Sequence, residues 1–317
     1  MENTLSPASS DKRGISTIEI FGRQVKVKNY ICSADGKSYP LKPGKTKLQL
    51  SVLPQSYCPA SCPFCIASGT NRHDRVDLKK LESVMRLLKK EELVRGVKIT
   101  GGEPFYDFDL LRETIDLLFD VFGPGLELSV STNGMDLERI TELKNLRYIE
   151  TFHISRHHYD DEINRRLFGG AAVPDGARLR EIISQISFKD IFVFNCMLLK
   201  DYIGTPDEAR RFLDFAIDIG VPKVGFMCCS GVNKFAIEQF TRFESVLKDG
   251  DPSLLFTRGF YDYDICHCRD GVYVSSDGRL IEFYGRDTVF CDPGYSRGLV
   301  YDSDNYLKDG FSGQILF

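Results

Sequence analysis

Three cysteines, Cys58, Cys62 and Cys65, stand close together in the segment YCPASCPFC, which Pro59 and Pro63 mark as a loop. Their odd number does not suit a disulfide framework, and a structural zinc site takes four ligands. A four-iron cluster normally binds one thiolate per iron, so three thiolates leave one iron open to coordinate a reagent. The spacing therefore predicts a 4Fe-4S site that takes part in chemistry instead of only carrying electrons.

Four other cysteines and one histidine bear on the alternatives. Cys32, Cys196, Cys228 and Cys229 are expected to be small buried hydrophobic residues. A zinc knuckle would need a distant fourth ligand, for which His73 is the nearest candidate. Zinc would explain none of the other polar loops described below, so an iron–sulfur cluster is the preferred interpretation.

The bulk composition suits a globular enzyme. Hydrophobic residues make up 42% of the chain and charged residues 27%, and the net charge of −4 gives no basic footprint for bulk nucleic-acid binding. Ten cysteines without a secretory leader indicate a reducing compartment. No apolar run approaches the roughly 20 residues that span a bilayer. We therefore expect a soluble, cytoplasmic protein without a membrane partner.

The elements that must position the cysteines alternate regularly along the chain. Strands are predicted at residues 48–53, 97–100, 126–131, 148–154, 191–198 and 223–227. Helices are predicted at 77–93, 107–122, 136–143, 176–186 and 205–219. Such alternation implies parallel strands joined by crossover helices. The pattern predicts an α/β fold, a partial (β/α)6 TIM-like barrel, because a full barrel has eight such units.

Three regions are expected on this basis. An N-terminal tail and extension covers residues 1–45, the barrel covers 46–230, and a C-terminal cap covers 231–317. In the cap, a helix near 234–248 precedes the segment GVYVSSDGRLIEFYG. Its Asp277-Gly278 pair suits the tight turn of a β-hairpin.

Polar and metal-binding groups follow each predicted strand. These loops are the cysteine loop, Gly101-Gly102-Glu103-Pro104, Ser131-Thr132-Asn133-Gly134, Ser155-Arg156-His157-His158, Asn195-Cys196-Met197 and Cys228-Cys229-Ser230. In a parallel barrel, active sites form at the C-terminal ends of the strands. We therefore expect these groups to converge on one rim.

A cysteine loop followed by Gly-Gly-Glu-Pro and Ser-Thr-Asn-Gly at successive strand ends resembles the radical S-adenosylmethionine (radical SAM) superfamily. Phe64, just before the last cysteine, is also typical of that family, and the resemblance covers roughly residues 46–230. The motifs ITGGEP, STNG and FNCMLLKD are most similar to the branch that contains the GTP 3′,8-cyclase of molybdenum-cofactor biosynthesis. The cysteine triplet is the specific part of this signal.

The resemblance implies two cofactors, a 4Fe-4S cluster on the cysteine triplet and S-adenosylmethionine at its open iron. Reductive cleavage of S-adenosylmethionine would give a 5′-deoxyadenosyl radical that abstracts hydrogen from a substrate. The electron would come from a donor such as a flavodoxin or a ferredoxin.

The same resemblance implies contacts between S-adenosylmethionine and the other loops. Gly101 and Gly102 would let the backbone approach the methionine moiety, and Pro104 would stiffen their turn. Glu103 would accept a charge-assisted bond from the ammonium group. Further contacts would come from Ser131 and Asn133 to the ribose, from Ser155 or Arg156 to the carboxylate or ribose, and from the backbone near Met197 to the adenine. As alternatives, Gly-Gly-Glu-Pro alone would be an ordinary turn, and Ser131 and Asn133 would cap the following helix.

Histidines gather in the segment FHISRHHYD. Strand alternation directs His153 and Ser155 to one face and Arg156 to the other. His157 and His158 are candidate catalytic residues that would bind substrate or relay a proton, or else they are solvated loop residues. Arg156 is the candidate for binding an anionic group through its forked donors.

Cysteines near the predicted hairpin suggest a second iron–sulfur cluster. Cys266 and Cys268 precede the hairpin and Cys291 follows it, similar to the auxiliary cluster of the cyclase and peptide-modifying branches. The first pair is spaced one apart instead of two and Cys291 comes late, so a degenerate remnant that only closes the barrel is the alternative. These departures, and a tail without Gly-Gly, argue against GTP cyclisation itself.

We therefore expect a radical SAM enzyme that abstracts hydrogen from a polar small molecule or nucleotide. The segment before the barrel is short for a peptide-recognition domain, because domains usually begin near about 50 residues. Modification of a peptide held by the C-terminal cap is the alternative. A non-catalytic iron–sulfur or zinc protein is the third hypothesis.

Overall fold

The computed structural model describes residues 15–28, 30–32, 38–40, 48–66, 72–229, 233–246, 254–259, 271–275, 280–284, 296, 298–311 and 313–317. Its central feature is a sheet of eleven strands. In this described part of the chain, no helix has both the length and the apolar character that a membrane crossing requires.

Six parallel strands form the middle of the sheet, as the sequence predicts. They are β5 (Leu48–Val52), β6 (Val94–Ile99), β7 (Glu127–Thr132), β8 (Thr151–Ser155), β9 (Phe192–Leu198) and β10 (Lys223–Cys228). Each strand pairs in parallel with the next one along the chain. The α/β class and the partial barrel are therefore confirmed, and among the described strands the sheet does not close on itself.

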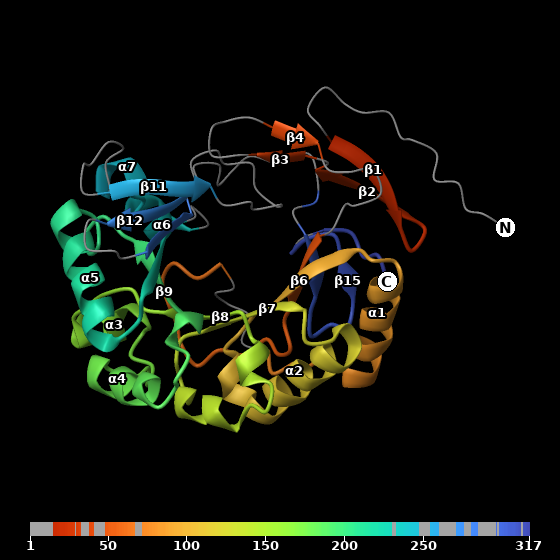
Figure 1. Cartoon of the computed structure of the whole chain (residues 1–317), viewed down its shortest axis with the longest axis horizontal. Helices are drawn as coiled ribbons and strands as arrows, with labels where there is room; N and C mark the ends of the chain where they lie inside the picture. The colour runs from red at the N-terminus through yellow and green to blue at the C-terminus, as the bar shows by residue number, and fades with distance from the viewer. Residues whose placement is uncertain are drawn as a thin grey trace.

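Helices cover the outer face of this curved sheet (Figure 1). They are α1 (Leu78–Lys90), α2 (Phe108–Phe122), α3 (Asp161–Leu167), α4 (Gly176–Ser184) and α5 (Pro206–Ile219). α1 begins where the Asp77 carboxylate accepts the Lys79 N–H at 2.9 Å. α5 begins with a Thr205 cap and a proline at the first turn, and it ends at Gly220, whose φ is +92°.

Several predicted helices differ from the structure. Residues 136–143 form a 3₁₀ helix, η2 (Leu137–Glu142), whose N-cap Asp136 makes no side-chain cap hydrogen bond. The single helix expected near 234–248 is two short ones, α6 (Lys234–Glu238) and α7 (Phe243–Val246). α3 was not predicted, because its seven residues are too few and too polar to show a clear apolar period. The other short helices are η1 (Pro104–Asp107), η3 (Leu146–Tyr148) and η4 (Lys189–Ile191).

Strands from the C-terminal region extend the sheet at both edges. β13 (Leu280–Tyr284) pairs in parallel with β10, and β12 (Gly271–Ser275) and β11 (Leu254–Gly259) follow it as antiparallel neighbours. The pairing of β12 with β13 confirms the predicted hairpin. At the other edge, β14 (Leu299–Tyr301) pairs in parallel with β5 and carries β15 (Leu307–Lys308). Thus the first barrel strand is flanked by a strand from the end of the chain.

Two small antiparallel pairs precede the barrel. They are β1 (Ile15–Ile20) with β2 (Arg23–Lys28), and β3 (Tyr30–Cys32) with β4 (Ser38–Pro40). Val25 and Val27 of β2 are buried in the main core, so the first pair packs on the barrel.

The two faces of the central sheet differ in chemistry. Toward the helices the strands present buried apolar side chains such as Leu50, Val130 and Phe152, which join one core with the helices. The opposite, inner face is half-buried and hydrophilic, and its members are Gln49, Ser51, Lys98, Ser129, Ser131, Thr151, His153 and Ser155. The strand register places Ser51, Lys98, Ser129 and Thr151 in one row across four strands.

Candidate functional site

The cysteine loop, residues 53–66, leaves β5 and is held by distant parts of the chain. The Leu53 N–H donates to the Tyr301 carbonyl of β14 at 2.8 Å. The Ser61 N–H donates to the Phe168 carbonyl, just after α3, at 3.2 Å. The loop is therefore fixed both to the edge of the sheet and to the helical layer.

The thiols of Cys58, Cys62 and Cys65 are free and half-buried. Burial raises the pKa of the Cys58 thiol to about 11 and the pKa of the Cys62 thiol to about 12. The neighbouring cysteines add to both shifts, because one thiolate opposes the ionisation of the next. A bound cation reverses this, since coordination deprotonates a thiol. The donor set thus fits a positively charged metal group.

Among the described residues, no three His, Cys, Asp or Glu side chains converge as the ligands of a single metal ion do. A zinc site requires such convergence. In a 4Fe-4S cluster each thiolate binds a different iron, so three cysteines spread along one loop suit a cluster better. His73, the alternative zinc ligand, stacks on Tyr57 with ring centroids 4.1 Å apart.

Gly101 and Gly102 pack the loop after β6 against the start of the cysteine loop. Gly101 has a φ of +121°, a conformation that favours glycine. A Cβ on Gly102 would lie 2.0 Å from the Tyr57 carbonyl oxygen. The expected close approach is present, but its observed partner is protein backbone. Approach to the methionine moiety stays a prediction.

Glu103 is 1% exposed and joins the loops after β6 and β7. Its Oε1 accepts from the Thr132 hydroxyl at 2.6 Å and from the Phe105 N–H at 3.0 Å, and its Oε2 accepts from the Asn133 N–H at 2.7 Å. Burial raises the pKa of the Glu103 carboxyl to about 7, although these donors favour the charged form. Pro104 is the first residue of η1, and its stiffening of this turn stays a prediction. The observed role of Glu103 is positional, and its contact with an ammonium group stays a prediction.

Ser131, near the end of β7, and Asn133, directly after that strand, differ in their contacts. The Ser131 Oγ is buried and has no hydrogen-bond partner within the described part of the chain. Such a group costs about 1–3 kcal/mol unless something satisfies it, so Ser131 fits the expected contact with S-adenosylmethionine. The Asn133 side chain instead accepts from the Met135 N–H at 2.9 Å and donates to the Cys58 Sγ at 3.9 Å.

An apolar layer covers one side of the cysteine loop. Its buried members are Phe64, Leu167, Leu199, Cys229 and Ala236, and Cys62 packs against them. The Asn233 amide donates to the Pro63 carbonyl at 2.9 Å and fixes the loop under this layer. Apolar cover of this kind keeps water away from a reactive centre.

His157 is 4% exposed and is a buried connector instead of a solvated loop residue. Its Nδ1 accepts from the Met197 N–H at 3.2 Å, so Nε2 carries the ring proton. Its ring lies 4.8 Å from the Phe64 ring, edge to face. Burial and the nearby Arg156 charge lower the pKa of His157 to about 3. His157 is therefore neutral near pH 7, and the expected proton relay there is not supported. The Met197 N–H is committed to this ring, and the Met197 carbonyl accepts from the Cys196 Sγ at 3.7 Å, so the adenine contact stays a prediction.

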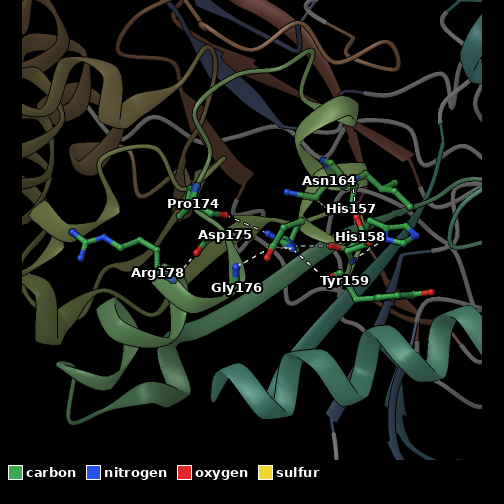
Figure 2. Close-up of polar contacts among 12 residues, drawn as sticks. His157, His158, Tyr159, Asn164, Pro174, Asp175, Gly176 and Arg178 are labelled. Atoms are coloured by element: carbon green, nitrogen blue, oxygen red, sulfur yellow. Dashed lines mark hydrogen bonds and ion pairs between the residues drawn. The ribbon is translucent and has the colours of Figure 1, made fainter.

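His158 is also buried, and its ring accepts a hydrogen bond from within its own loop. Its Nδ1 accepts from the Asp160 N–H at 2.9 Å, and its ring lies 4.3 Å from the Tyr159 ring. Burial lowers the pKa of His158. Figure 2 shows the His157–Tyr159 segment on one side of the drawn polar contacts and the Pro174–Gly176 turn on the other. The solvated-loop alternative is wrong for both histidines.

Arg156 is 1% exposed and connects the His158–Tyr159 segment to Pro174. This observed role corrects its expected role as an anion-binding residue. Its guanidinium donates to the carbonyls of His158 at 2.7 Å and Pro174 at 3.2 Å. It also donates to the Tyr159 carbonyl at 3.3 Å and pairs with the Asp161 carboxylate. With these donors committed on the helix side of the sheet, Arg156 has a structural role.

Replacing Arg156 by methionine is expected to lower the free energy of unfolding by roughly 3 kcal/mol, because buried carbonyls and a carboxylate lose their partner. Urea denaturation measures this. Arg165→Met is the matched control, since Arg165 is exposed and pairs with Glu162 on its own helix, and it should change stability by less than about 0.5 kcal/mol. Unchanged stability with lost activity in Arg156→Met would restore the anion-binding assignment.

His153 and Ser155, the other predicted residues of this segment, lie on the inner face of the sheet in β8. His153 is bonded at both nitrogens, to Thr151 Oγ1 at 3.2 Å and to Asn195 Oδ1 at 3.3 Å. Burial, with the charge of Lys98, lowers the pKa of His153 to about 3, so it is a neutral lining group. Ser155 is the cross-strand neighbour of Asn195 on the same face. Sequence reasoning included Asn195 among the rim groups but missed Lys98 as a lining residue, although polar residues at alternate strand positions were the available signal.

Cys266, Cys268 and Cys291 lie outside the described residues. The described strands β12 and β13 fall between the pair and Cys291 in sequence. The second cluster therefore stays a prediction.

Comparison with known proteins identifies the family of the barrel. Residues 52–243 match the model of the Radical SAM superfamily, a span that includes the cysteine loop and all the loops described above. A probable GTP 3′,8-cyclase from Sulfurisphaera tokodaii is 25% identical over 210 residues, which are 65% of this chain and 64% of the relative. A second one, from Metallosphaera sedula, is 27% identical over 188 residues, 57% of this chain and 55% of that protein.

Among solved structures, Streptococcus suis SuiB bound to S-adenosylmethionine matches with a TM-score of 0.54 and 17% identity. The match covers 86% of this chain and 63% of that one, and at this identity it supports the fold alone. The chain spans less than two thirds of the length of each of these proteins.

Proposed function

The chain belongs to the radical SAM superfamily, and from this premise we propose that it abstracts hydrogen from a polar small molecule or nucleotide. When bound, a 4Fe-4S cluster and S-adenosylmethionine supply a 5′-deoxyadenosyl radical for that step. The match to two probable GTP 3′,8-cyclases, at 25% and 27% identity, supports a nucleotide-like substrate.

The observation that carries the substrate class is the hydrophilic inner face. In TIM barrels the interior is normally filled by bulky branched apolar side chains. Here a row of Ser51, Lys98, Ser129 and Thr151 takes their place, and these residues are half-buried instead of fully packed. Hydroxyl, ammonium and amide groups on this face suit a ligand rich in hydrogen-bonding groups.

We assign the binding, positioning and water-excluding roles to residues of this chain. The three cysteines of the loop would hold the cluster, and Ser131 would bond S-adenosylmethionine. Glu103 fixes the cysteine loop, which it bonds at Tyr57, relative to the loop after β7, which it bonds at Asn133. The apolar layer around Phe64 limits water at the cluster side. An external reductant is required, for which we propose a flavodoxin or ferredoxin.

The test is anaerobic cleavage of S-adenosylmethionine by the reconstituted, dithionite-reduced chain. We expect 5′-deoxyadenosine and methionine in equal amounts, and a faster release when the right substrate is added. Nucleotides and short peptides, each deuterated at carbon, would be offered in parallel. Deuterium in 5′-deoxyadenosine from a nucleotide supports the proposal, and deuterium only from a peptide favours the peptide alternative. Failure to cleave S-adenosylmethionine would leave a non-catalytic metal protein.

A second cluster on Cys266, Cys268 and Cys291 is part of the proposal. Such a cluster could accept an electron or bind a substrate directly. Iron counting on the cysteine variants described in the Discussion decides whether it forms.

A further inference from the structure

We propose that Asn133 is a positioning residue that raises the reduction potential of the cluster by donating an N–H···S hydrogen bond to the Cys58 thiolate. The inference rests on the proposed function, because it requires a cluster on Cys58. It replaces the expected ribose contact of Asn133 with a contact that the structure contains, Nδ2 to Sγ at 3.9 Å.

The orientation of the Asn133 amide is fixed by a second hydrogen bond. The Met135 N–H lies 2.9 Å from Oδ1 and can only donate, so the atom that faces it must be the carbonyl oxygen. The amide nitrogen therefore occupies the other branch, toward Cys58. The residue is 7% exposed, so water competes little for this donor.

Glu103 fixes the backbone next to both partners of this contact. Its Oε2 accepts the Asn133 N–H at 2.7 Å, and its own N–H donates to the Tyr57 carbonyl at 2.8 Å, one residue before Cys58. One residue therefore fixes the backbone beside the donor and the backbone beside the acceptor. A weak donor–sulfur contact held in this way persists because neither loop is free to move apart.

The sign of the effect follows from charge. Reduction adds negative charge to the cluster and its thiolate sulfurs, and an N–H dipole aimed at a sulfur stabilises that charge. With Asn133 present, the reduced state is favoured and the cluster accepts an electron more easily. Without it the potential falls, and a given donor reduces a smaller fraction of the protein.

The test is a redox titration of the full, cluster-loaded chain without S-adenosylmethionine, followed by the electron paramagnetic resonance signal of the reduced cluster. In Asn133→Ala we expect the reduction equilibrium to weaken roughly fivefold to tenfold, where tenfold corresponds to 59 mV for one electron. Asn145→Ala is the matched control, because the Asn145 amide bonds Asp116 of α2 at 2.8 Å and the residue precedes β8, whereas the cysteine loop leaves the opposite, C-terminal end of its parallel strand β5. Its potential should equal that of wild type.

A second measurement separates the hydrogen bond from a loss of loop structure. Electron–nuclear double resonance of the reduced wild-type cluster should show an exchangeable proton that disappears in deuterium oxide. Asn133→Asp keeps an acceptor for Met135 and replaces the amide donor by a carboxylate, so one exchangeable coupling should be missing there, even if Asn133→Ala assembles no cluster, while the proton of the Ala60 N–H, which also bonds Cys58, should remain. An unchanged potential in loaded Asn133→Ala, or an Asn133→Asp spectrum that keeps every exchangeable coupling of the wild type, would overturn the inference. Absence of a cluster in wild type would instead contradict the proposed function.

Discussion

Changing Cys58, Cys62 and Cys65 together to alanine is expected to remove the catalytic cluster and all S-adenosylmethionine cleavage. The three side chains are the cysteines of one half-buried loop, and no other described side chains converge to replace them as metal ligands. Each cubane takes about four irons. If only this cluster forms, iron per reconstituted chain should fall from about four to none. If the second cluster also forms, iron should fall from about eight to four.

Cys196→Ala is the matched control for this experiment. Cys196 is fully buried in β9 and packs in the main core, so its loss should cost about 1 kcal/mol of stability and no iron. The complementary variant, Cys266→Ala/Cys268→Ala/Cys291→Ala, should lose iron only if the second cluster exists. Retention of full iron by the Cys58/Cys62/Cys65 variant, or stoichiometric zinc in the wild type, would contradict the assignment.

Gly102→Ala is expected to displace the cysteine loop and to abolish most cluster assembly while the barrel stays folded. The added Cβ would lie 2.0 Å from the Tyr57 carbonyl oxygen and 2.8 Å from the Ser56 carbonyl carbon, so the two loops must separate. Separation breaks the 2.8 Å bond from the Glu103 N–H to Tyr57 and moves the residue beside Cys58. We expect a destabilisation of roughly 2–4 kcal/mol and a loss of iron of tenfold or more. Urea denaturation and iron analysis measure the two effects.

Gly125→Ala serves as the control for Gly102→Ala. Gly125 lies in the turn between α2 and β7, and a Cβ there would meet no atom within 4 Å. The substitution should leave iron content unchanged and alter stability by less than about 1 kcal/mol. Normal iron loading of Gly102→Ala would show that the loops tolerate separation, and the close contact would then have no bearing on cluster assembly.

Much of the fold was predictable because it depends on local periodicity. The six parallel strands were each recognisable as short apolar runs between amphipathic helices, and α1 shows why, since Leu81, Val84 and Leu88 recur at helical spacing. β14 was not predictable, because a three-residue strand carries no period of its own and its pairing with β5 is decided by the finished sheet.

The candidate site was predictable to the extent that its residues share a loop. The cysteine triplet and the motifs at the strand ends were visible as spacings. The partners of Arg156 and Glu103 were not, because Pro174 and Thr132 reach them only through the packing of separate loops. An arginine at a strand end therefore suggested an anion, whereas tertiary contacts gave it carbonyl groups to bind.

The pairing of β14 with β5 has a consequence for the order of events during synthesis. The Leu53 N–H, at the start of the cysteine loop, is satisfied by the Tyr301 carbonyl at 2.8 Å. While the ribosome is still making the C-terminal part, the edge of β5 is unpaired and the loop lacks this anchor. We therefore expect the cysteines to be more accessible to iron and sulfide during this interval. Completion of the chain closes that interval, so slowing translation before residue 299 is expected to lengthen the time available for loading the cluster.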